Sequence, residues 1–76
     1  MKERQPDALI ITKARRLSSS GSAKALRLGA GLSLRETAVA VEVAPSTVLR
    51  WERHERTPRG AAAIRYADFL AQLAAQ

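Results

Sequence analysis

Two helix boundaries that lie close together limit what this chain can fold into. A Gly-Ala-Gly run at 29–31 ends one helical segment, and Ser33 with Glu36 then matches the capping box that begins the next. Only residues 42–44 separate this second helix from Pro45, and proline suits the first turn of a helix. Two short helices joined by so tight a turn predict a helix-turn-helix.

Apolar residues recur at helical spacing through most of the chain. We expect helices at about 22–30, 34–41, 45–53 and 60–76. Gly31 should end the first of these in a left-handed conformation. The expected apolar stripe of the last helix comprises Ile64, Ala67, Leu70, Ala71, and Leu73 or Ala74. Strand-like alternation is confined to a few residues, so the sequence predicts an all-α bundle of four to five helices, with the helix-turn-helix domain at 22–76.

The chain is basic over most of its length and neutral at its C-terminal end. Its 76 residues fit one domain and carry 13 Lys and Arg against 7 Asp and Glu, a net charge of +6. The excess lies before residue 60, because residues 60–76 carry only Arg65 and Asp68. A basic domain with one neutral end indicates a polyanionic partner, and nucleic acid is the usual one.

Several classes of function are disfavoured by what the sequence lacks. Without cysteine there are no disulfides or thiolate metal sites, and one histidine cannot supply a histidine cluster. A glycine-rich phosphate loop, a catalytic carboxylate pair and a nucleophile beside a base are all missing, so we expect no enzyme, cofactor, metal or small-molecule ligand. No apolar run approaches the ~20 residues that span a bilayer, and we expect a cytoplasmic protein without membrane contact.

The N-terminal segment, residues 1–21, leaves two alternatives open. A proline and an aspartate at 6–7 suit the first turn of a short extra helix. The β-branched residues at 10–12 have low helix propensity and favour a basic arm instead. An arm would lie across a DNA groove with Lys13, Arg15 and Arg16. The serine-rich stretch at 18–22 is expected to be a hinge or a helix cap.

The segment at 45–53 has two unlike sides when it is drawn as a helix. One side carries Val48, Trp51 and Glu52 and is expected to pack into the protein. The other side carries Ser46, Leu49, Arg50 and Arg53. A core would not accommodate the two guanidinium groups, so this side needs an outside partner, and a helix-turn-helix places its second helix in the major groove of DNA.

The stretch LRLGAGLSLRETAVAVEVAPSTVLRWERHERTP resembles the lambda-repressor-like family of helix-turn-helix domains, also called Cro/C1-type or XRE-like. The similarity covers about residues 22–75, and its strongest parts are GLSLRE, the STVLRWE run and Pro58. The amino-acid sequence of this stretch looks most like that of actinobacterial and actinophage members. The resemblance implies a sequence-specific regulator of transcription that binds double-stranded DNA, a small repressor or Cro-like switch protein acting as a homodimer on a palindromic operator.

Roles for particular residues follow from this resemblance. Base edges would be contacted by Ser46 and Arg50, while Leu49 could meet a thymine methyl or pack on a neighbouring protein surface. An ion pair between Arg27 and Glu52 would tie the first helix of the domain to the third. The phosphate-contacting residues would be Thr47, Arg53, Arg56 and Arg59, to which we add Arg35.

Three positions depart from the family's pattern. Glu42 stands where the turn often has glycine, and a positive φ there would cost about 1 kcal/mol. Leu34 cannot clamp a phosphate as the family's frequent glutamine does. Pro45 replaces a long polar residue that reads bases in other members, so one reading position is lost.

A second hypothesis is a protein–protein interaction module of the antitoxin or adaptor kind. Leu49 and Phe69 would be its exposed anchors, since Phe69 lies off the apolar stripe of the last helix. Binding would then depend weakly on salt, whereas DNA binding would depend on it steeply. Trp51 is expected in the core, Tyr66 and Phe69 could join it there, and His54 is expected in solvent near a helix end.

Overall fold

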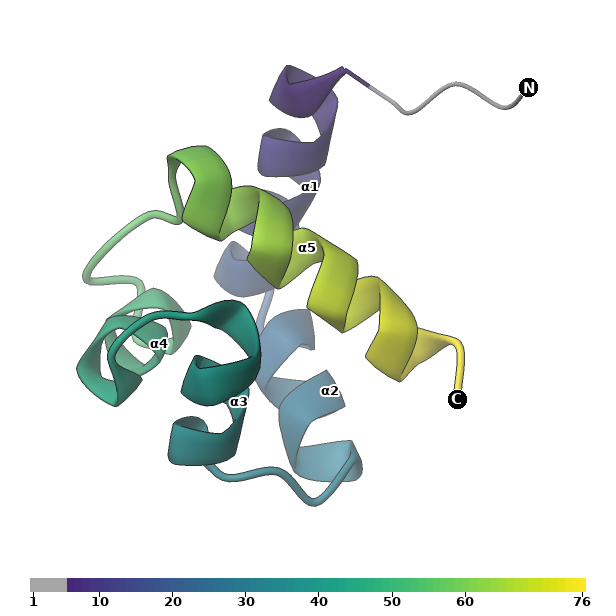
Figure 1. Ribbon diagram of the computed structural model, residues 1–76, viewed down its shortest axis with the longest axis vertical. Helices are drawn as coiled ribbons and strands as arrows, with labels where there is room; N and C mark the ends of the chain where they lie inside the picture. Colours follow the sequence, from purple (N-terminus) through teal and green to yellow (C-terminus); the bar gives the residue numbers. More distant parts are fainter. Residues whose placement is uncertain (1–5) are drawn as a thin grey trace.

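The computed structural model describes residues 6–76, and this range is all-α. The helices are α1 (Asp7–Ser19), α2 (Ser22–Gly29), α3 (Leu34–Val41), α4 (Pro45–Glu52) and α5 (Gly60–Ala74). α5 crosses the bundle, with α1 behind it and α2, α3 and α4 on the side away from the start of α1 (Figure 1). The predicted fold class and helix order are therefore confirmed, while the polar start at residues 1–5 lies outside the described residues.

The three short helices α2, α3 and α4 all end in the same way. A residue with a left-handed backbone follows within two positions of each end: φ is 74° at Gly31, 64° at Glu42 and 63° at His54. The next N–H then donates to the carbonyl five residues back, as in the Schellman motif: Leu32 to Arg27, Val43 to Ala38 and Glu55 to Arg50. The prediction for Gly31 is confirmed. Glu42 and His54 adopt this conformation with side chains, at a cost of about 1 kcal/mol each.

The start of α3 is the capping box that the sequence predicts. The N–H of Glu36 donates to Ser33 Oγ at 3.0 Å, and the N–H of Ser33 donates to Glu36 Oε1 at 2.9 Å. The donation to the carboxylate lowers the pKa of Glu36. The next helix, α4, has Pro45 in its first turn but lacks a capping side chain, because its N-cap residue is Ala44.

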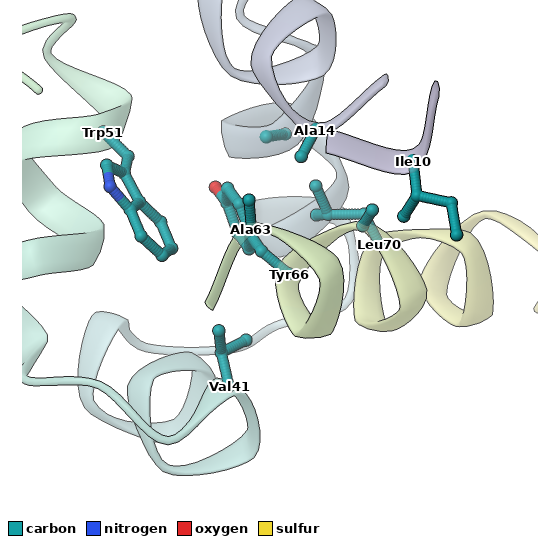
Figure 2. Close-up of a cluster of buried hydrophobic side chains, with 9 residues drawn as sticks. Ile10, Ala14, Val41, Trp51, Ala63, Tyr66 and Leu70 are labelled. Carbon is teal, nitrogen blue, oxygen red and sulfur yellow. The ribbon is translucent and has the colours of Figure 1, made fainter. Parts of the chain in front are cut away.

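An aromatic pair forms the centre of the core. The rings of Trp51 from α4 and Tyr66 from α5 have centroids 4.6 Å apart, and their planes are tilted by 36°. Figure 2 shows the indole facing Tyr66 and Ala63, with Val41 of α3 below them. The burial of the Trp51 side of α4, with Trp51 only 4% exposed, fixes which face of that helix is left for solvent.

The buried stripe of α5 differs from the predicted one. It consists of Ala63, Tyr66, Ala67 and Leu70. The expected members Ala71 and Ala74 are exposed, so the prediction is wrong for them, and Ile64 and Leu73 are only half-buried. Tyr66 determines this rotation, because its large ring packs on Trp51 and brings its own side of α5 inward.

The N-terminal segment is a helix over Asp7–Ser19 and belongs to the same core as the rest of the bundle. Ile10 and Ala14 are buried, and α1 packs chiefly against α5. The serine-rich stretch does not form a hinge throughout, because Ser18 is a buried residue inside the helix. The turn is made by Ser20 and by Gly21, whose φ is 85°.

Candidate nucleic-acid interface

The two sides of α4 differ in burial as the sequence predicts. Val48 is 0% exposed and Trp51 4% exposed, so both belong to the interior. The opposite side is turned to solvent: Ser46, Arg50 and Arg53 are exposed, and Thr47 and Leu49 are half-buried. α4 therefore presents a narrow polar and basic surface that no part of the described chain covers.

The anchors of the interaction-module hypothesis are less available than that hypothesis requires. Leu49 is half-buried, and Phe69 is half-buried against the core. The large exposed apolar side chains of the described residues are instead Leu9, Leu28 and Val39. No structural observation therefore favours Leu49 and Phe69 as a protein-binding pair.

A buried ion pair joins α2 to α4 on the protein-facing side of α4. Arg27 donates to Glu52 through Nε at 2.6 Å and a terminal nitrogen at 2.9 Å, and their side chains are 9% and 3% exposed. The bond to Glu52 raises the pKa of Arg27, and burial together with the Glu52 charge raises the pKa of Tyr66. Because the guanidinium neutralises Glu52, this carboxylate does not oppose the binding of an anion to α4.

A surface hollow beside α4 brings four of the expected DNA-contacting residues together. We call it the recognition hollow; its lining includes Thr47 and Arg50 of α4 with Arg56 and Arg59 of the following loop. No acidic side chain is among the residues that line it. Other expected residues lie outside this hollow. Ser46 is exposed on α4, Arg53 is exposed at the C-cap of α4, and Arg35 lies in the first turn of α3.

The turn of the helix-turn-helix is supported from α5. Arg65 donates from Nε to the carbonyl of Val41 at 2.8 Å, where the last carbonyls of α3 lack partners within the helix. The same Nε is 3.9 Å from the carboxylate of Glu42. The side chain of Glu42 is 74% exposed, so this pair adds little stability, and the bond to Val41 is the contact that holds the turn.

Side chains of α1 hold the end of α4 and the loop after it; the sequence analysis did not single out Ser18, and it gave Arg15 a place in a basic arm instead. Ser18 donates from Oγ to the carbonyl of Trp51 at 2.8 Å, and Arg15 donates from Nε to the carbonyl of Pro58 at 3.0 Å. Nε2 of His54 lies 3.2 Å from the carbonyl of Ser18. The available signal was spacing: Ser18 continues the series of Ile10 and Ala14 at four-residue intervals along one face of a helix.

An outward-facing second helix of a helix-turn-helix and an adjoining hollow lined by arginines and hydroxyls are features typical of the class of DNA-binding domains. The comparison with protein families agrees, since a family model described as helix-turn-helix matches residues 24–72. The chain belongs to this family, the XRE and lambda-repressor-like helix-turn-helix domains, which are DNA-binding regulators of transcription and not a family of enzymes. Searches of curated proteins and of solved structures found no match.

Within residues 6–76, none of the helices combines the length and the apolar character needed to cross a membrane.

Proposed function

We propose that the chain is a sequence-specific transcription regulator that lays residues 45–53 in the major groove, with Arg50 as its principal base-reading residue. One observation carries this proposal: Arg50 is exposed on α4 and lines the recognition hollow together with Arg56 and Arg59. Arginine paired to O6 and N7 of guanine is the commonest specific contact in the major groove. Glu36, an acid that could have held Arg50 on the protein surface, is engaged by the N–H of Ser33.

The remaining base and phosphate contacts follow from position around Arg50. Ser46, one turn earlier on the exposed side of α4, reaches a base edge or a phosphate, and half-buried Leu49 offers its methyl groups to thymine. The phosphate contacts are assigned to Thr47, Arg53, Arg56, Arg59 and Arg35. These contacts supply affinity and orientation but carry no sequence information.

The mode of regulation belongs to the same proposal. We assign the chain to small repressors or Cro-like switch proteins of the phage type, similar to actinobacterial and actinophage members, acting in the cytoplasm and on the nucleoid. Such proteins bind as two-fold dimers to half-sites about one helical turn apart, roughly 34–36 Å. Analytical ultracentrifugation with and without operator DNA measures the dimer, and the identity of the neighbouring genes tests the phage origin.

The operator can be found by selection from a library of random duplexes, and the contacts are then measured by fluorescence anisotropy. Arg50→Ala should lower affinity by about 1–3 kcal/mol and relax the preference at one base position in each half-site. Arg56→Ala should weaken selected and random duplexes alike. Lys24→Ala is the control: it removes an exposed lysine of α2 and should have little effect.

Three results would overturn the proposal. If selection returns no enriched sequence while the chain is folded by circular dichroism, sequence-specific binding is excluded. If an operator is found but Arg50→Ala binds it with unchanged affinity and preference, the reading residue is wrongly assigned. Binding that hardly changes with salt would also contradict it, since counterion release makes DNA affinity fall steeply as salt rises.

A further inference from the structure

A second hollow lies between α1 and the loop after α4. Its lining includes Thr12, Arg15 and Arg16 from α1 and His54, Arg56 and Thr57 from the loop. We call it the flanking hollow. Its lining residues include three arginines and several hydroxyls but no acidic side chain, and Glu55, the one acid of the loop at 53–59, lines neither hollow. This combination of groups is suited to the oxygens of a phosphate.

The walls of the flanking hollow are held together by hydrogen bonds between its two sides. Arg15 on α1 is bonded to the carbonyl of Pro58, and His54 on the loop lies against the carbonyl of Ser18. Pro58 is itself fully buried, which further fixes the loop at the contact with Arg15. A hollow whose sides are already joined does not have to be ordered when a ligand arrives, which lowers the cost of binding.

The flanking hollow adjoins the recognition hollow. Arg56 and Thr57 line both of them, so the loop forms a ridge with Arg50 and Arg59 on one side and Arg15 and Arg16 on the other. α1 ends at Ser19, before the part of the chain that matches the family, which begins at residue 24. The α1 wall therefore lies outside the part of the chain that matches the family.

We propose that the flanking hollow binds a phosphate of the DNA backbone next to the site read by α4, with Arg16 as the contributing residue of α1. The proposal rests on the proposed DNA-binding function and extends the contact surface beyond the recognition helix and its loop. Arg16 is exposed, whereas Arg15 is engaged with the loop and Arg56 serves both hollows. Because Arg16 does not line the recognition hollow, its removal separates the contribution of the flanking hollow from that of the recognition hollow.

The test is the salt dependence of binding to a fluorescein-labelled duplex of about 30 base pairs and arbitrary sequence, because non-specific binding depends on the same backbone contacts. Each phosphate contact contributes about 0.9 to the slope of log K against log salt concentration. Arg16→Gln should make the slope shallower by about that amount and weaken binding on the order of five-fold at low salt. Arg16→Lys, which keeps the charge, should restore most of the slope.

Two comparison variants separate this inference from general effects of charge and from the proposed function. Lys24→Gln removes one positive charge from α2 outside both hollows and should leave the slope near the wild-type value. Arg56→Gln should reduce the slope at least as much as Arg16→Gln, because Arg56 lines both hollows. Circular dichroism establishes that each variant is folded.

The possible results are distinguishable. If the wild type does not bind the duplex, the proposed function fails and this inference fails with it. If the wild type binds and Arg56→Gln reduces the slope while Arg16→Gln does not, the flanking hollow alone is refuted. Equal changes for Arg16→Gln and Lys24→Gln would indicate a long-range charge effect and would also overturn the inference.

Discussion

Ser18, in the last turn of α1, donates a hydrogen bond of 2.8 Å from Oγ to the main-chain carbonyl of Trp51, near the end of the recognition helix. The carbonyl also accepts the N–H of His54 at 3.2 Å, so two bonds meet where α4 ends. The last carbonyls of a helix have no partners within it and must find them elsewhere. A helix that precedes the matched part of the family thereby fixes the C-terminal end of α4.

Ser18→Ala should lower the free energy of unfolding by about 1 kcal/mol, because the bond is buried and its acceptor keeps only one partner. Urea denaturation measures this change. Ser19→Ala is the matched control, since Ser19 is exposed and its hydroxyl bonds only locally, to the carbonyl of Arg16 at 3.3 Å. Equal effects of the two substitutions would mean that the contact between α1 and α4 adds no stability.

The ion pair between Arg27 and Glu52 should be costly to break on one side only. Arg27→Met leaves the buried Glu52 carboxylate without its cation, and breaking such a pair costs about 3–5 kcal/mol. This is comparable with the whole stability of a small domain, so circular dichroism should show a largely unfolded variant. The double variant Arg27→Met with Glu52→Leu removes both charges and should recover most of the helical signal. A double variant no better folded than the single one would contradict this account.

A buried hydroxyl on α3 destabilises the folded protein because it lacks a hydrogen-bond partner. Thr37 is 1% exposed, and its Oγ1 has no hydrogen-bond partner. Thr37→Val keeps the shape and removes the unpaired polar group, so it should raise the free energy of unfolding by about 1–2 kcal/mol. Thermal unfolding followed by circular dichroism measures the gain. A loss of stability would show that the hydroxyl is paired in solution, for example by a water molecule.

Acid should weaken the fold partly through the capping box of α3. The pKa of Glu36 is lowered below its ordinary value of 4.5 by the N–H of Ser33, so the unfolded chain binds the proton more readily. The resulting stability is complete above pH 4.5 and is lost as the pH falls through the folded-state pKa. Glu36→Gln can keep the capping bond without titrating, and its stability should fall less than that of the wild type on acidification. Identical pH profiles in urea unfolding would refute this.

The left-handed positions after α2 and α3 should respond in opposite directions. Glu42→Gly relieves the strain of a side chain at φ 64° and should stabilise the protein by up to about 1 kcal/mol. Gly31→Ala introduces the same strain at φ 74°, where a Cβ would meet no atom within 4 Å, and should destabilise it by about 1 kcal/mol. Urea unfolding compares the two, and shifts in the same direction would mean that contacts rather than backbone strain decide these positions.

Much of the fold was accessible from the sequence. The capping box of Ser33 and Glu36, Pro45 in a first turn and the terminator Gly31 mark helix ends through bonds between near neighbours, and α2, α3 and α4 lie within one or two residues of the predictions. The stripe of α5 was misplaced because it depends on where Trp51 meets Tyr66. The helix at 7–19 stayed an open alternative because its stability comes from packing against α5.

The sequence by itself determined that this protein is made of short helices and that α4 has an apolar and a basic side, because helix caps and helical periodicity relate residues no more than a turn or two apart. Only the tertiary structure decided that Arg50, Arg56 and Arg59 line one hollow and that Arg15 and Ser18 hold its neighbourhood in place. The bonds from Arg15 to Pro58 and from Ser18 to Trp51 join positions far apart in the chain, and no local pattern specifies such contacts. They form only once burial of Trp51 and Tyr66 has brought α1, α4 and α5 together.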